Sequence, residues 1–202
     1  DGRQRLVRLR RTLSGAGADL GLTLGTAGEV RLGLFRGRLR LREDTNVLAG
    51  LIELPQAQMG AARLQLGLDT LDNSRFPRTG YAAEFSVYAS HPRLGASDRY
   101  TKAYAAATKP LTLGVHTVML SGFLGRALGD HALPDYELFT LGGFQRLSGY
   151  QTGELTGTEV GYGRINYNVR LTQADLFDGA YIGLSLEAGR IGESAFGASR
   201  TS

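Results

Sequence analysis

Arg164-Ile165-Asn166-Tyr167-Asn168-Val169-Arg170-Leu171 alternates polar and apolar side chains without a break. An alternation with a period of two places one kind of residue on each face of a β-strand. The same period recurs along most of the chain, whereas the apolar spacing of an amphipathic helix does not. The sequence therefore predicts an all-β protein whose strands each have one apolar and one polar face.

Eight strands are predicted, each bounded by turn residues or by a longer connection. Their expected ranges are 5–24, 29–42, 59–72, 81–90, 99–109, 115–128, 157–173 and 180–191. The alternation slips by one residue in the second strand, after Val30, Leu32 and Leu34. Beyond the slip, Leu39 and Leu41 occupy the apolar phase and Arg36, Arg38 and Arg40 the polar one. A one-residue slip of this kind predicts a β-bulge.

The connections between these strands alternate in length. Turns near residues 26, 76, 112 and 177 are compact, whereas the connections near 50, 95 and 142 are longer. Short turns at one end and long loops at the other are typical of outer-membrane barrels. Most strands run about 10–15 residues, near the tilted span of a bilayer. A soluble barrel with an apolar interior is the alternative, because alternation alone does not say which face meets lipid. Strand length and loop asymmetry favour a transmembrane antiparallel up-and-down β-barrel.

Composition excludes several other classes of protein. The 202 residues contain no Cys, so disulfides and thiolate metal sites are excluded. The net charge of +4 comes from arginines scattered singly, which argues against nucleic-acid binding. The three histidines lack metal-ligand spacing, and no Gly-x-Ser-x-Gly nucleophile motif occurs. We therefore expect no catalytic residue, metal or cofactor in this chain.

The connection at about 129–156 is the longest, and its sequence is unusual for a solvated linker. The stretch 139–150 holds three glycines, three aromatic residues and Arg146. Loops of this length are usually functional or disordered, and this one carries too many apolar residues to be a linker. We expect it to fold inward and pack inside the barrel.

The chain ends also bear on the architecture. An even number of strands places both ends on the long-loop side, whereas complete outer-membrane barrels normally keep both termini on the short-turn side. Those barrels also tend to end in an aromatic residue, but this chain ends Arg200-Thr201-Ser202. We expect residues 1–202 to form a partial barrel domain, the interior segment of a larger barrel. A complete eight-stranded barrel is the alternative.

Two motifs resemble those of a known family. The pattern D-x-x-D-x-x-x-F-P-x-x-G resembles a turn of the bacterial surface antigen family, the barrel of the BamA/TamA superfamily; here it comprises Asp69, Asp72, Phe76, Pro77 and Gly80. Leu141-Gly142-Gly143 followed by Leu147-Ser148-Gly149-Tyr150 is similar to the long-loop signature of that family. The order of turn, three strands and loop also agrees. The resemblance implies an outer-membrane location. It also implies that the eight predicted strands correspond to the sixth to the thirteenth strand of a sixteen-stranded barrel.

The resemblance also implies a contact inside the barrel. The loop arginine of the family corresponds to Ser148, and its acidic partner corresponds to Glu187 on the eighth predicted strand. Because the arginine is absent here, Arg146, Arg164 or Arg170 is expected to neutralise Glu187. The alternative is that Glu187 is simply hydrated in a polar lumen. Asp69 and Asp72 are expected to cap backbone amides of the turn.

Function follows from the same comparison. Leu-Ser-Gly-Tyr is similar to the barrels of patatin-like phospholipases of outer-membrane type, in which a lipase domain precedes the barrel. This implies a barrel that anchors or translocates an attached passenger. A BamA/TamA-like assembly protein or a two-partner secretion pore is the alternative. The expected partners are the lipid bilayer and a passenger or client protein; the oligomeric state is left open.

Overall fold

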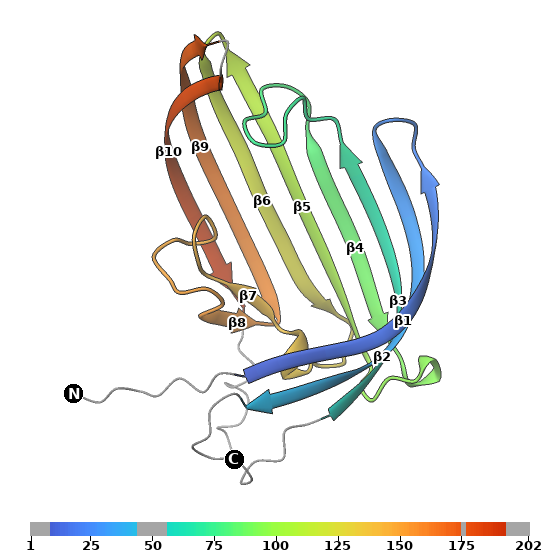
Figure 1. Cartoon of the computed structure of the whole chain (residues 1–202). Helices are drawn as coiled ribbons and strands as arrows, with labels where there is room; N and C mark the ends of the chain where they lie inside the picture. Colours follow the sequence, from blue (N-terminus) through green and yellow to red (C-terminus); the bar gives the residue numbers. More distant parts are fainter. Residues whose placement is uncertain (1–8, 44–55, 175–176, 193–202) are drawn as a thin grey trace, which may run out of the picture.

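A computed structural model describes residues 9–43, 56–174 and 177–192. Eight long strands form one antiparallel sheet in which each lies beside its neighbours in the chain, and the sheet curls into an open half-barrel (Figure 1). The strands are β1 (Leu9–Thr23), β2 (Gly28–Glu43), β3 (Gln56–Asp69), β4 (Ala82–Ser90), β5 (Tyr100–Leu113), β6 (His116–Leu128), β9 (Glu159–Ala174) and β10 (Phe177–Ile191). The predicted all-β, antiparallel up-and-down architecture is confirmed.

The two ends of the sheet differ as predicted. The β1–β2, β3–β4 and β5–β6 turns lie at one end of the sheet, together with the end of β9 and the start of β10; we call this the short-turn end. The β4–β5 and β6–β9 connections lie at the opposite, long-loop end, where β1 and β3 also begin and β2 and β10 end (Figure 1). The edge strands β1 and β10 do not pair with each other within the described residues. Two residues, Gly114 and Val115, join β5 to β6, with Gly114 at φ 59°.

Two details of the predicted strands are wrong. The β-bulge in β2 is absent: its pairing with β1 and with β3 runs without a shift through the whole stretch of the supposed slip. Arg36, Arg38 and Arg40 therefore lie on the same face as Leu32 and Leu34. Strand β5 also continues to Leu113, because Pro110 is accommodated within the strand opposite Met119.

The two faces of the sheet have different chemistry. We call the face contacted by the loop 129–154 the inner face and its opposite the outer face. The outer face carries large apolar side chains that are strongly exposed, among them Leu20 at 74% and Leu184 at 77%. On the inner face, Leu39 and Tyr100 are 0% and 2% exposed beneath the connections that fold over them. The exposed apolar surface is the one that lipid would cover.

Strand β4 is shorter than its neighbours, and its missing hydrogen bonds are replaced. Residues 91–98 leave the sheet after Ser90 and fold back along β3. The His91 N–H donates to the Gly60 carbonyl over 3.0 Å, and the Ser97 N–H donates to the Gln58 carbonyl over 2.8 Å. The Gln58 N–H donates to Ser97 Oγ over 2.9 Å. This connection includes the 3₁₀ turn η1 (Pro92–Leu94).

No helix in the described ranges has the length and apolar character needed to cross a membrane. Adjacent residues of β10 instead test which face of the sheet meets lipid. Leu184→Arg places a charge on the outer face and is expected to destabilise the barrel by about 2–4 kcal/mol near the bilayer midplane. Ser185→Arg places the same charge on the inner face and should cost far less. The full-length protein reconstituted in lipid vesicles is unfolded with urea to compare the two; equal losses would contradict the assignment of the faces.

Candidate functional site

The long loop contains a small hairpin that lies against the inner face of the sheet. Strands β7 (Phe139–Leu141) and β8 (Leu155–Gly157) pair with each other and lie beside the long-loop ends of β9 and β10 (Figure 1). Leu141 is 1% exposed and belongs to a cluster of buried side chains. The other buried members of this cluster are Phe123, Val160 and Tyr162, and Leu147 packs against it. The hairpin was not predicted, because its three-residue strands are too short to show a period.

Two glycines shape the loop that leaves this hairpin. Gly142 and Gly143 have φ values of 122° and 109°, which favour glycine. A Cβ at Gly142 would lie 2.3 Å from the Gln151 carbonyl oxygen, too close for any side chain. The Gly143 N–H donates to the Tyr150 carbonyl over 3.1 Å and closes the loop. Both glycines of the sequence motif therefore have a backbone role.

The tip of the loop binds the Glu187 carboxylate through its backbone. The Leu147 and Ser148 N–H groups donate to Glu187 Oε2 over 3.1 and 2.9 Å, and the Ser148 hydroxyl donates over 3.0 Å. Leu147 has a φ of 75°, which is uncommon for a bulky residue and costs about 1–3 kcal/mol. This conformation turns two successive N–H groups toward one carboxylate oxygen, an arrangement known to bind anions.

Among the described residues, Glu187 forms no ion pair with Arg146, Arg164 or Arg170, the arginines expected to neutralise it. The Arg146 guanidinium lies over the Phe123 ring, 4.7 Å from its centroid, and Arg170 lies 6.0 Å from the Tyr181 ring centroid. Arg164 faces Glu187 across the β9–β10 pair, but the described residues include no ion pair between them. No ion pair between Glu187 and these arginines is therefore seen in the part of the chain that the structure describes. Three hydrogen bonds reach Glu187 Oε2, so Glu187 is not merely hydrated, whereas Oε1 is buried without a hydrogen-bond partner among the described residues.

The β3–β4 connection is held together by side chains that accept hydrogen bonds from its own backbone. Asp72 Oδ1 accepts from the Arg78 and Thr79 N–H groups over 2.8 and 3.1 Å. Asp69 Oδ1 accepts from the Leu71 N–H over 3.0 Å. Gly80 has a φ of 87°, and a Cβ there would lie 2.0 Å from the Thr70 carbonyl oxygen. The acidic residues and the glycine of the motif thus fix a single loop conformation.

At the short-turn end, this connection contacts strands that lie further along the sheet, including the edge strand β10. The Phe76 ring stacks on Tyr181 of β10, with ring centroids 4.2 Å apart and planes 4° apart. Arg78 donates to the Gly114 carbonyl at the β5–β6 turn. Thr112 also donates to the Arg78 carbonyl over 2.7 Å. The turn motif therefore joins strands that are not neighbours in the sheet.

The turn motif and the long loop line the same cavity. The Phe76-Pro77 turn enters it from the short-turn end, and Gln145 of the long loop enters it from the other. Between them the wall is polar and comes from β6 and β9. The remaining lining residues are Arg75, Arg78, Thr117, Met119, Arg164, Asn166, Asn168 and Tyr181. The Tyr162 hydroxyl donates to the Gln145 carbonyl over 2.6 Å and fixes the loop tip there.

A second anchor of the long loop lies nearer its start. Lys102 Nζ on β5 lies 2.5 Å from Glu137 Oε2, and Glu137 is 8% exposed. The neighbouring Tyr136 hydroxyl, on the 3₁₀ turn η2 (Asp135–Glu137), donates to Asp98. Burial, followed by this hydrogen bond, raises the pKa of Tyr136 and keeps the phenol protonated. Sequence reasoning missed this pair; the only available signal was a lone lysine on the inner side of an alanine-rich strand.

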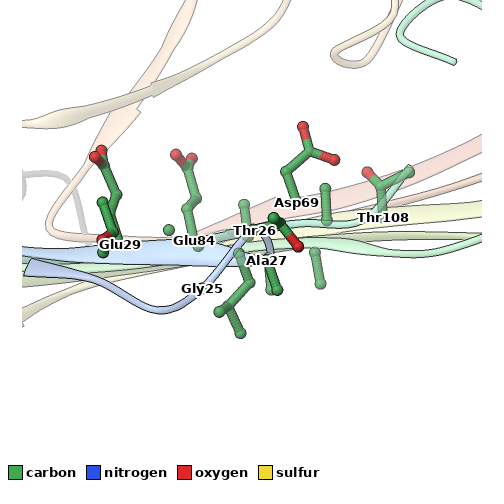
Figure 2. A pocket seen from close by; sticks show the side chains of 15 residues that line it. Gly25, Thr26, Ala27, Glu29, Asp69, Glu84 and Thr108 are labelled. Carbon is green, nitrogen blue, oxygen red and sulfur yellow. The ribbon is translucent and has the colours of Figure 1, made fainter. Parts of the chain in front are cut away.

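Another group of polar side chains lies on the inner face at the short-turn end. Glu29, Glu84 and Asp69 project to the same side of the sheet in Figure 2, and the small residues Gly67 and Ala106, which pair with Glu84, line the same hollow. Arg31 donates to both oxygens of Glu29 over 2.8 and 2.9 Å. Over the described ranges, no group of three or more His, Cys, Asp or Glu residues could hold a metal ion.

Comparison with protein families fixes the relationship of this chain. Residues 4–188 match the Omp85 superfamily domain. The chain belongs to the Omp85 superfamily. This confirms the predicted relationship to BamA/TamA-type barrels and places the chain in the bacterial outer membrane. No curated protein matches the chain.

An Omp85 barrel of known structure has the same fold. The crystal structure of BamA from Haemophilus ducreyi lacking POTRA domains 1–3 superposes with a TM-score of 0.74 at 16% sequence identity. The alignment covers 90% of this chain and 42% of that chain, so this Omp85 chain spans under half the length of its structural relative. At this identity the likeness concerns the fold alone.

The contact between the loop and Glu187 can be tested by a double-mutant cycle. Ser148→Ala removes one of the hydrogen bonds to a charged acceptor and is expected to destabilise the folded barrel by about 1 kcal/mol, with Glu187→Gln costing more. Because both changes act on one contact, the double variant should lose little more than Glu187→Gln alone. Stability is measured from the conversion of folded to unfolded bands on heating the full-length protein.

Ser185→Ala, on the same face of β10, is the matched control and should be nearly neutral. Additive losses in the double variant would show that Ser148 and Glu187 act independently. Ser148→Arg restores the arginine of the family. It should stabilise the barrel when Glu187 is present, because the arginine can then pair with the carboxylate. It should destabilise the Glu187→Gln variant, in which that negative charge is missing.

Asp72 gives the turn a predictable dependence on pH. The N–H groups of Thr79 and Arg78 lower the pKa of Asp72, so its stabilising effect is present above the ordinary carboxyl pKa of about 4. The effect is lost as the pH falls through the lowered, folded-state value. Asp72→Asn is therefore expected to lower the unfolding temperature at pH 7 but to approach the wild type near pH 3. Asp130→Asn is the control; a pH-independent gap for Asp72→Asn would contradict the assignment.

Proposed function

We propose that this Omp85 barrel anchors or translocates an attached passenger, a patatin-like lipase domain outside the chain described here. The observation that carries the proposal is the contact between the loop and Glu187. Ser148 stands where the arginine of the family is expected, and backbone N–H groups take over its role. The sequence around Ser148 resembles the barrels of patatin-like phospholipases, and no nucleophile motif occurs within this chain.

The packing of the inner face supports a barrel whose lumen is kept filled at rest. The long loop is held at Glu187 and at Lys102, which lie on different strands of the wall. The β3–β4 turn lines, together with Gln145 of the long loop, the cavity described above. Passage of a polypeptide would require at least one of these contacts to break. Anchoring requires no such movement, and the anchored lipase would carry all of the catalytic chemistry.

Assembly of other outer-membrane proteins is the second candidate function. Its support is that the inward loop still binds the acidic residue that the family uses, although with different donors. The two functions differ in what precedes residue 1. A Gly-x-Ser-x-Gly lipase domain would favour the passenger, whereas several linking repeats would favour assembly.

Depleting the protein from cells distinguishes the two functions. If the barrel serves its own passenger, the amounts of other outer-membrane barrels should stay at their normal level. The passenger should then lose its membrane attachment when the barrel is deleted. A general fall in other barrels would overturn the passenger proposal and support assembly.

Labelling from outside intact cells tests the orientation on which both candidates depend. Ser74 at the short-turn end and Ala132 in the long loop are both exposed, and the chain contains no Cys. In the full-length protein, Ala132→Cys is expected to react with a membrane-impermeant maleimide, whereas Ser74→Cys should react only after the membrane is permeabilised. Equal labelling at both sites would contradict the orientation.

A further inference from the structure

Three arginines lie in a row on the outer face of β2, beyond its apolar part. Val30, Leu32 and Leu34 occupy the outer face from the short-turn end, and Arg36, Arg38 and Arg40 continue the same phase toward the long-loop end. All three arginines are exposed. With a rise of about 3.3 Å per residue, they span about 13 Å of the strand.

The neighbouring strands change character at the same level. Ala16 of β1 and Gly60 of β3 pair with Arg36, and the outer face becomes polar beyond them. The residues paired with Arg38 and Arg40 are Ser14, Thr12, Gln58 and Gln56. These four are exposed and uncharged. The result is a surface with hydrogen-bonding side chains around a row of positive charges; we call these seven residues the β2 basic patch.

Within the described ranges, none of the three arginines forms an ion pair with a carboxylate. Arg36 lies close to the β4–β5 connection, since its Nε is 2.8 Å from where a Cβ at Gly95 would be. A glycine with φ 90° allows the arginine to pass there. In the pairing of β2 with β1 and β3, Arg38 and Arg40 face the uncharged polar residues named above.

We propose that the β2 basic patch binds the phosphate groups of lipid headgroups in the leaflet on the long-loop side. The patch directly continues the apolar face that lipid tails cover, so its level is that of the headgroups. Guanidinium groups bind phosphate through paired N–H donors. Lipid is favoured over a soluble anion because the patch lies outside the barrel, on the side away from the lumen, and adjoins the exposed leucines.

Two other basic residues of the outer face, Arg126 and Lys109, can be compared with the arginines of the β2 basic patch. Arg126 on β6 also lies at the long-loop end, but Glu159 binds it over 2.8 Å and neutralises it. Lys109 is an outward lysine at the opposite end of the sheet, where it lies 5.8 Å from the Tyr81 ring centroid. Among the described residues of the outer face, the β2 basic patch gathers three arginines that form no ion pair with an acidic side chain.

Binding of a phosphorylated glycolipid to the full-length protein tests the proposal. The probe is fluorescent lipid A carrying two phosphates, titrated against the protein in neutral detergent micelles and followed by anisotropy. Arg38→Gln/Arg40→Gln is expected to weaken binding at least about tenfold, because each basic residue near a lipid surface contributes appreciably. Arg31→Gln/Arg63→Gln is the matched control: it removes the same charge from the inner face and should bind like the wild type.

Two further measurements keep the outcome decisive. Dephosphorylated lipid A should bind the wild type more weakly than the diphosphorylated form, by a factor similar to the loss in the variant, and this comparison needs no variant to fold. Arg38→Lys/Arg40→Lys keeps the charge and should retain most of the binding. Equal binding of the two lipid forms, or equal loss in the inner-face control, would overturn the proposal.

Discussion

The structure depends on one constraint: the hydrocarbon core of a membrane contains no water that could bind backbone polar groups. Every backbone N–H and C=O group that faces lipid must be paired within the protein, because an unpaired group there costs several kcal/mol. The long strands meet this requirement with registers that run unbroken over most of their length. Where β4 ends early, residues 91–98 supply hydrogen bonds to β3 instead. The same requirement explains why β2 runs without a bulge although its side-chain pattern changes.

A polar lumen imposes a different requirement. Glu187 faces inward on β10, and removal of a carboxylate from water is costly unless it is hydrogen-bonded or paired. The loop supplies hydrogen bonds from main-chain N–H groups, which remain after any substitution of a side chain except proline. Leu147 accepts an uncommon backbone conformation for this purpose, and its side chain is stabilised by packing on the buried cluster. Strain at one residue is thereby coupled to the position of the whole loop.

The sequence was sufficient for the strands, the two types of connection and the general position of the loop. Period-two alternation in stretches such as 164–171 is a direct record of a sheet with two unlike faces. The alternation was misread in β2, where arginines follow leucines on the same face. A strand that passes from lipid into water changes from apolar to polar residues on one face, and in the sequence this looks like a one-residue shift of register. The partner of Glu187 was also missed, since main-chain donors leave no trace in the sequence. The contact between Lys102 and Glu137 joins distant segments and has no local pattern.

The stack of Phe76 on Tyr181 has a consequence for the order of folding. The two rings come from opposite parts of the chain, and the contact forms only once β10 has taken its place in the sheet. Contacts between residues about a hundred positions apart form slowly, because the intervening chain must first be confined. The β3–β4 connection therefore reaches its final position late, when all the strands it bridges are already aligned. Formation of the contact between Phe76 and Tyr181 therefore marks the point at which this part of the barrel wall is complete.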